Sequence, residues 1–200
     1  MIYALSQLVE VRAGHPFRGS VPVNDDGDAR VIQMRDISSA SVVAWPTLVR
    51  SSLSGSRSPD WLQAGDLLFA ARGMRNYAIC LRDVPARTVC AQYFFVLRIK
   101  EAKAPAVLPA YLAWHINSGP CQRYLASNAE GTDQLSIRRT VLEDMPIAIP
   151  PLERQQLLVS LAEAASHERR CLEALIRTRE QQLDALAHQL LSPERSPSTV

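Results

Sequence analysis

PIAIPPLERQQLLVSL, residues 146–161, begins as an extended run and continues as a series of helix-forming residues. Pro150 and Pro151 cannot donate hydrogen bonds to a sheet, and each disfavours a helical conformation in the residue before it. These restrictions exclude an earlier helix start. A helix can begin near Leu152, because proline is tolerated at the first helical turn. The stretch predicts the end of one domain and the start of a separate helix.

The segment 152–191 contains neither proline nor glycine. Its apolar residues recur with a period between 3.5 and 3.6, which predicts one helix with an apolar stripe. At 1.5 Å per residue such a helix is about 60 Å long, whereas a domain of 150 residues has a radius of gyration of roughly 15 Å. Part of the stripe is therefore expected to meet another chain or another helix. The expected contact residues are Leu158, Leu172, Ile176, Leu183 and Leu190, and residues 192–200 are expected to form a disordered tail.

Residues 1–150 show short strand patterns followed by helical ones. We expect strands at 30–34 and 40–45, a hairpin of AGDLLFAAR and YAICLR around the turn RGMRN, and one long strand over TVCAQYFFVLRI at 88–99. Helical patterns follow at 108–118, at 121–127 and from Ser136. The predicted fold class is α/β (α+β), with a twisted mixed sheet and short helices, followed by one long C-terminal helix.

Composition excludes several classes of protein. The hydrophobic fraction of 47% suits one domain with an appendage. Neither a membrane-spanning run nor a leader pattern is found, so a cytoplasmic protein without membrane contact is expected. Four cysteines lack the spacing of zinc ligands or of a disulfide framework, and no metal or other cofactor is predicted for the chain.

The net charge is +2, and 20 of the 22 basic residues are arginine. Arginine suits phosphates and guanine edges because its planar fork donates two parallel hydrogen bonds, although a GC-rich genome would produce the same bias. Residues 1–150 carry 16 basic and 13 acidic side chains, whereas residues 151–200 carry 6 and 7. The small basic excess therefore belongs to the first part of the chain.

Several motifs together resemble the specificity subunit of type I restriction-modification enzymes. They are GHPFRG at 14–19, AGDLLFAARG at 64–73, LPAYLAWHINS at 108–118, EGTDQLSIRRTVLEDMPIAIPPLERQ at 130–155, and the helix that follows. In that family a target-recognition domain reads one half of a split DNA site, and the next helix spaces two such domains and docks methyltransferase subunits. The methyltransferases bind S-adenosylmethionine and methylate adenine, while the specificity chain is not catalytic. The resemblance implies a DNA target-recognition domain over 1–150 and a spacer and dimerisation helix over 151–191.

The common family member has two recognition domains and two helices, whereas this sequence shows one of each, as in a half-length form. An identical copy packed antiparallel would restore a two-domain molecule with two-fold symmetry, which would read a split palindrome. The implied partners are double-stranded DNA, a second copy, a methyltransferase subunit docked near Leu152, Gln155 and Gln156, and in some systems a restriction subunit. The sequence leaves open whether the partner is a different specificity chain, and whether the system restricts DNA or only methylates it.

Polar residues on turns are the candidates for DNA contact. Arg72, Arg75 and Asn76 flank a tight turn, although a solvated hairpin tip explains them too. In the loop that contains Thr132, Asp133 and Gln134, a glutamine suits an adenine edge, although helix capping explains that loop as well. Phosphate contacts are expected from Arg18, Arg35 and Ser38.

Two other classes of protein share some of these sequence features. Asp60, Glu101 and Lys103 match the residue types of a magnesium-dependent nuclease motif. The last two, however, follow a predicted strand instead of lying within it. A coiled-coil adaptor without a nucleic-acid role explains the helix and leaves the arginine-bearing turns unexplained. The four histidines are dispersed, and none stands near a recognisable nucleophile motif.

Overall fold

The computed structural model describes residues 1–37, 43–53, 59–131 and 135–191. By its internal contacts the chain divides into two units, Met1–Ser160 and Leu161–Val200, and each is described by itself. The first unit is the mixed α/β domain that the sequence predicts, and the long C-terminal helix is also present, so the predicted fold class is confirmed.

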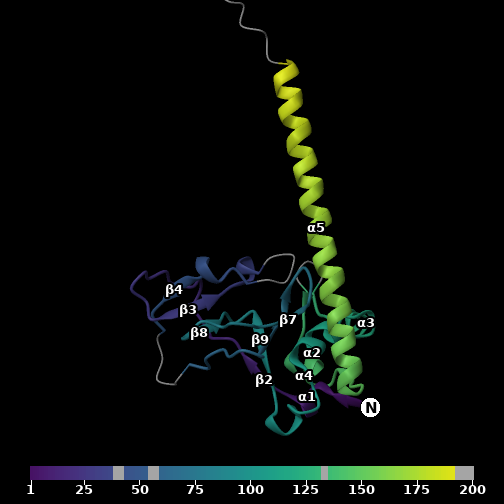
Figure 1. The fold of residues 1–200 in the computed structure, drawn as a ribbon. Coiled ribbons are helices and arrows are strands. Elements are labelled where there is room, and N and C mark those ends of the chain that lie inside the picture. The colour runs from purple at the N-terminus through teal and green to yellow at the C-terminus, as the bar shows by residue number, and fades with distance from the viewer. Residues whose placement is uncertain (38–42, 54–58, 132–134, 192–200) are drawn as a thin grey trace, which may run out of the picture. The chain divides into compact units, whose positions relative to one another are not determined.

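A four-stranded antiparallel sheet forms the centre of the first unit (Figure 1). Its strands, in spatial order, are β2 (Val9–Ala13), β9 (Phe94–Ile99), β5 (Leu67–Ala70) and β7 (Ala78–Cys80). All four residues of β5 are buried, because this strand lies between two others and both its faces are covered. Leu67 and Phe69 belong to one hydrophobic cluster, and Leu68 and Ala70 to the other, as the two-residue period of a strand requires.

Short helices cover one face of this sheet. They are α1 (Leu5–Leu8), α2 (Pro109–Ile116), α3 (Gly119–Asn128) and α4 (Arg139–Glu143), and their apolar residues share a cluster with Leu67 and Phe69. Asn117, at the end of α2, accepts a hydrogen bond from Ala78 N at 2.8 Å and donates one to Ala78 O at 2.7 Å. This side chain therefore satisfies backbone groups of the edge strand β7.

A second sheet packs on the other side of the central sheet. It contains β4 (Val49–Ser51), β3 (Ala29–Ile32) and β8 (Thr88–Cys90), with β3 antiparallel to β4 and parallel to β8. Ile32 and Cys90 share a cluster with Leu68 and Val96 of the central sheet. The 3-10 helices η1 (Met34–Asp36) and η2 (Trp45–Thr47) follow β3.

The predicted hairpin is confirmed, since β5 and β7 pair antiparallel with Leu67 opposite Cys80. The single strand predicted over 88–99 is wrong. The chain turns at Ala91, whose carbonyl oxygen accepts a hydrogen bond from Phe94 N at 3.1 Å, and β8 and β9 belong to different sheets. Apolar residues on both sides of this turn concealed it in the sequence.

Two further elements differ from the prediction. Of the strand predicted at 40–45, only 43–45 are described, and there Val43 forms one bridge to Ile37 before η2 begins. No helix starts at Ser136. Instead β10 (Leu135–Ser136) pairs with β6 (Arg72–Gly73), and α4 begins at Arg139, because the backbone of Ser136 bonds to Glu130.

The first and last strands of the domain pair with each other. β1 (Ile2–Ala4) is antiparallel to β11 (Pro146–Ala148). The latter lies in the extended part of the stretch 146–161 that precedes the long helix. Tyr111 Oη donates a hydrogen bond to Ala148 O at 2.7 Å, so α2 also holds β11. The remaining element, η3 (Glu101–Lys103), follows β9.

Helix α5 runs without a break from Leu152 to Leu191, as predicted. Its first turn is attached to the domain through Gln155, whose side chain is completely buried. The amide accepts a hydrogen bond from Leu108 N at 2.9 Å, and its Nε2 donates to Ala106 O and Pro150 O, both at 2.8 Å. Gln155 was expected at the methyltransferase seam. That expectation is corrected, because these bonds enclose the side chain within the domain.

In the second unit, α5 exposes a series of large apolar side chains. The exposed leucines and isoleucine from Leu161 onward are Leu161, Leu172, Leu175, Ile176, Leu183, Leu186, Leu190 and Leu191. The tail expected at 192–200 lies outside the described residues. None of the helices in the described part of the chain combines the length and apolar content that a membrane span needs.

Candidate nucleic-acid interface

The tip of the β5–β7 hairpin and the loop before α4 lie side by side. Arg72 is opposite Ser136, and Gly73 is opposite Leu135, in the β6–β10 ladder. A further hydrogen bond joins Ile137 N to Ala71 O at 2.9 Å. The two segments that the sequence predicted separately as DNA-reading loops are therefore joined through their backbones.

The 3-10 helix η1 packs against the hairpin tip at Gly73. The Gly73 φ of +135° is a conformation that side chains disfavour, and a Cβ atom there would be 3.5 Å from Met34 Cε. Arg35 follows Met34 and is exposed, and Asp36 holds the η1 turn by accepting a hydrogen bond from Gln33 N at 2.8 Å. Arg35 is therefore the chain neighbour of a residue that packs against the hairpin tip.

Asn76 has a structural role that the sequence prediction missed. It is only 6% exposed, and its Nδ2 donates a hydrogen bond to Ala70 O at 2.9 Å. Ala70 N in turn donates to Tyr77 O at 2.8 Å, which closes the hairpin. The expectation that Asn76 reads DNA is corrected, because its amide is used inside the turn, while Arg72 and Arg75 on the same tip are exposed.

The second reading loop is closed at its base. The backbones of Glu130 and Ser136 exchange two hydrogen bonds of 3.0 and 2.8 Å, and Arg138 forms a salt bridge of 2.8 Å with Glu130. Thr132, Asp133 and Gln134, the predicted reading residues between them, lie outside the described residues, as does Ser38. The flanks of this loop are nevertheless fixed next to Arg72.

Two exposed residues here were not predicted from the sequence. Tyr93 is 44% exposed at the turn between β8 and β9, and its carbonyl oxygen accepts a hydrogen bond from Ala71 N at 3.0 Å. Arg138 has an exposed side chain at the end of the second loop. The only available signals were a tyrosine inside an apparently continuous strand and an arginine inside an apparently continuous helix.

We call Arg35, Arg72, Arg75, Tyr93, Ser136 and Arg138 the loop cluster. Arg35, Arg72 and Arg75 form no ion pair with any residue in the described ranges. By contrast, Arg138 of the cluster is paired with Glu130, and Arg12, Arg87, Arg98 and Arg139 are each paired with a carboxylate. Unpaired guanidinium groups on adjoining turns can donate to phosphates or to base edges.

Arg18 is exposed one residue before Gly19, and no described contact brings it into the loop cluster. It follows His15, whose backbone N donates to Cys90 O at 2.7 Å. Its expected phosphate contact stays a prediction.

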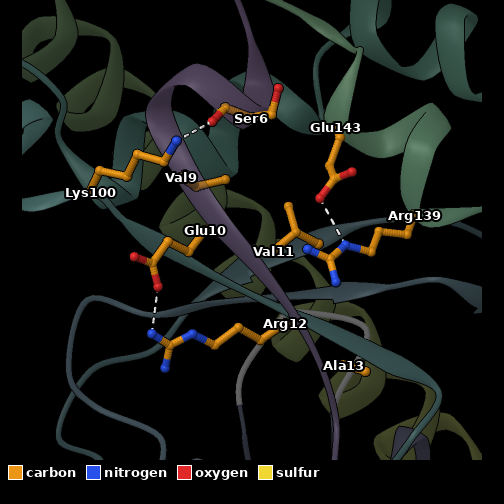
Figure 2. Close-up of a pocket in the computed structure, with 9 residues that line it drawn as sticks. All are labelled: Ser6, Val9, Glu10, Val11, Arg12, Ala13, Lys100, Arg139 and Glu143. Atoms are coloured by element: carbon orange, nitrogen blue, oxygen red, sulfur yellow. Dashed lines mark hydrogen bonds and ion pairs between the residues drawn. The ribbon is translucent and has the colours of Figure 1, made fainter.

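A second polar surface lies beside β2 (Figure 2). It is an open hollow of about 640 Å³ lined by Arg12, Lys100, Arg139 and the carboxylates Glu10 and Glu143, among others. Figure 2 shows Arg12 directed at Glu10 and Arg139 at Glu143, the latter pair at 2.8 Å. The Arg12 guanidinium holds the pKa of the Glu10 carboxyl below its ordinary value. Because both arginines are paired with carboxylates and Lys100 donates a hydrogen bond to Ser6 O, the hollow is a weaker anion site than the loop cluster.

The nuclease interpretation finds little support in the geometry. Asp60 accepts a hydrogen bond from Arg12 at 2.7 Å, and Lys103 lies 5.2 Å from the centre of the Tyr3 ring. Within the described residues, no three histidine, cysteine or acidic side chains are grouped so that they could hold a metal ion. Asp60 and Lys103 are therefore engaged in contacts that support the fold.

The residues predicted for protein contact are divided between two environments. Leu152 and Gln156 are exposed on the first turns of α5, and Leu158 is half-buried there. In the second unit the exposed fraction of Leu172, Ile176, Leu183 and Leu190 ranges from 54% to 84%. The apolar stripe predicted for protein contact is therefore open along the second unit.

The chain is a mixed α/β domain followed by a long helix with an exposed apolar stripe. Residues 1–164 match the family described as the type I restriction modification DNA specificity domain, and the chain belongs to this family. Specificity subunits of type I restriction-modification systems are non-catalytic, and the match confirms the resemblance found in the sequence. A comparison with curated proteins gave no match.

Solved structures that share this fold include the following three. The HsdS subunit from Thermoanaerobacter tengcongensis has a TM-score of 0.65 and 18% identity, covering 100% of this chain and 51% of that one. The S subunit of the M. genitalium type I restriction-modification system has a TM-score of 0.58 and 14% identity, with coverages of 98% and 46%. A chain from a structure on complex assembly and conformational transition of the type I R-M system has a TM-score of 0.60 and 16% identity. The match covers 93% of this chain and 43% of that one. The chain thus spans about half the length of these proteins.

Proposed function

We propose that this chain reads one half of a split DNA site and directs a partner adenine-N6 methyltransferase to it. The observation that carries this proposal is that two predicted reading loops are joined by the β6–β10 ladder, and that Arg72 and Arg75 on the first of them form no ion pair within the described residues. The chain supplies the reading groups, and S-adenosylmethionine is held by the methyltransferase subunit. A restriction subunit joins the same assembly in systems that also cleave DNA.

A titration of the assembled complex against specific and random DNA at two salt concentrations tests the reading role. Arg72→Ala or Arg75→Ala is expected to weaken binding to the specific site more than to random DNA, by about 1–3 kcal/mol if a base edge is read. Arg139→Ala is the matched control, because this exposed arginine is already paired with Glu143. Equal losses on both DNAs would make Arg72 and Arg75 phosphate contacts. No loss on either would move the reading surface elsewhere.

A second experiment tests the target in the cell. Modification-sensitive sequencing of the host genome, with and without this gene, is expected to show a split adenine-methylated motif that disappears on deletion. A palindromic motif would support two identical half-site readers, while an asymmetric one would support pairing with a different specificity chain.

The apolar stripe of α5 supports self-association as the second part of this function. The full chain is expected to sediment with about twice its 22.2 kDa mass. Replacing Leu172 and Ile176 with glutamate would place charges in the interface and weaken the dimer, whereas Arg177→Glu, about 100–140° away from these two positions around the helix, would not. A monomeric wild-type chain would favour a different specificity chain as partner.

A further inference from the structure

The exposed apolar stripe of α5 carries two charges of opposite sign. Leu161, Glu168, Leu172, Leu175, Arg179 and Leu186 follow at spacings of 7, 4, 3, 4 and 7 residues. At 3.6 residues per turn these positions share one face of the helix. The four leucines are between 54% and 58% exposed, and Glu168 and Arg179 are exposed as well.

This series reads the same from either end, except that glutamate and arginine exchange places. We infer that the stripe receives a second copy of this chain in antiparallel orientation, in the register that pairs Glu168 with Arg179 of the second copy. The two-fold axis then passes between Glu173 and Ala174. This register is specific to the self-association proposed above and rests on it.

The same axis matches the apolar side chains. Leu172 faces Leu175 of the second copy, and Leu161 faces Leu186 of the second copy. These are the layers of an antiparallel coiled coil, in which the two kinds of core position alternate across the interface. Two identical ion pairs therefore form, one on each side of the leucine layers that surround the axis.

Other arrangements leave these charges without a partner. In a parallel dimer Glu168 would face Glu168 of the second copy, and Arg179 would face Arg179 of the second copy. A shift by one heptad would bring Glu168 opposite either Leu172 or Leu186. A charge enclosed against leucine is strongly unfavourable, so the charged pair selects orientation and register more than it adds stability.

A hydrogen bond within its own helix orients the Arg179 side chain for such a pairing. Its Nη1 donates a hydrogen bond to Gln182 Oε1 at 3.3 Å, which directs the guanidinium along the stripe. A carboxylate from a second copy replaces or adds to this neutral acceptor with a charge-assisted bond, which is the stronger kind.

Charge exchange in the full chain, measured by sedimentation equilibrium, tests the register. Glu168→Arg and Arg179→Glu are each expected to raise the dimer dissociation constant about tenfold or more, because each places like charges in contact. The double variant E168R/R179E is expected to return close to the wild-type value. Far-UV circular dichroism checks that all variants keep their helix.

The outcomes separate this inference from the function that it rests on. Unchanged dimerisation in both single variants would indicate a parallel dimer, and failure of the double variant to recover would indicate another register. Either result overturns the proposed pairing and leaves the dimer in place. A wild-type chain that remains monomeric at all concentrations overturns the pairing together with self-association, while the DNA-binding tests on Arg72 and Arg75 stay independent.

Disulfide cross-linking gives a second measurement that does not depend on charge. In a Cys171→Ser background, a mixture of the Leu161→Cys and Leu186→Cys chains is expected to form a cross-linked dimer on mild oxidation. Each of the two variants alone is expected to form little cross-linked dimer. The other cysteines, Cys80, Cys90 and Cys121, are wholly or partly buried and do not contribute. Cross-linking of Leu161→Cys alone would contradict the antiparallel register.

Discussion

Arg72 and Ser136 lie directly opposite each other in the β6–β10 ladder, although more than sixty residues separate them in the sequence. The backbones of two loops are thereby held together, while the side chains of Arg72 and Arg75 stay exposed. This arrangement separates the groups that shape the surface from the exposed groups that are proposed to contact DNA. Substitutions can therefore distinguish the two roles.

Asn76→Ala is expected to destabilise the domain by about 1–3 kcal/mol, because the Ala70 carbonyl oxygen loses its buried donor. Urea unfolding measures this loss. Asn128→Ala is a matched control, since Asn128 makes the same kind of bond to Tyr124 O at 2.8 Å but on the exposed end of α3. Equal effects of the two substitutions would contradict the structural role of Asn76.

Gln155→Ala is expected to lower the free energy of unfolding by about 1–3 kcal/mol, because Ala106 O and Leu108 N lose their partner. Gln156→Ala, at the next and exposed position, is expected to leave stability unchanged and to weaken methyltransferase binding instead. Thermal unfolding and a pull-down with the methyltransferase subunit measure the two effects. Similar stability of both variants would show that the Gln155 bonds do not anchor the helix.

Stability is expected to fall in mild acid. Burial lowers the pKa of His115 from its ordinary value of 6.5, and its Nε2 accepts a hydrogen bond from Ala148 N at 3.2 Å. Because the unfolded chain binds this proton more readily, stability is full above pH 6.5 and decreases as the pH falls toward the lower folded pKa. Burial also lowers the pKa of His15, which contributes in the same direction.

Urea titrations at pH 7.5 and at about pH 5 test this dependence. His115→Gln is expected to reduce the difference between the two conditions, because glutamine can accept the Ala148 hydrogen bond without titrating. His167→Gln, on the exposed second unit, is the control and is expected to keep the wild-type difference. An unchanged pH dependence in His115→Gln would exclude His115 as its source.

DNA binding by the chain alone is expected to be weak and dependent on salt, because residues 1–150 carry an excess of only three positive charges. If Arg72 and Arg75 both contact phosphates, the double alanine variant is expected to reduce the slope of log K against log salt by about two units. If both read bases, the slope stays nearly constant and specificity falls. Fluorescence anisotropy at several salt concentrations distinguishes these results.

The sequence predicted the elements that local chemistry determines. The prolines before Leu152 and the unbroken period to Leu191 fixed helix α5, and Gly65 and Gly73 marked the hairpin of β5 and β7. The turn at Ala91 was missed because it is enclosed by apolar residues that suit a continuous strand. The register that joins Arg72 to Ser136 is a long-range contact, and no local period reports it.

Individual side chains were the hardest to predict. Asn76 and Gln155 have polar side chains of the kind usually found at the surface, yet each satisfies backbone groups inside the domain. Their burial depends on the position of a neighbouring segment, which the sequence does not reveal. Tyr93 was overlooked for the opposite reason, because an aromatic residue in an apolar run suggests the core, whereas it is partly exposed beside Ala71.

The backbone pairing of β6 with β10 also bears on how such a protein evolves. The hairpin tip is held by main-chain bonds and by Asn76, none of which involves the side chains of Arg72, Met74 or Arg75. Those three positions can change identity while the sheet below them keeps its packing. Mutational drift at the tip therefore has a small fitness cost through folding. If these side chains read DNA as proposed, a lineage can acquire a new target without first acquiring a new scaffold.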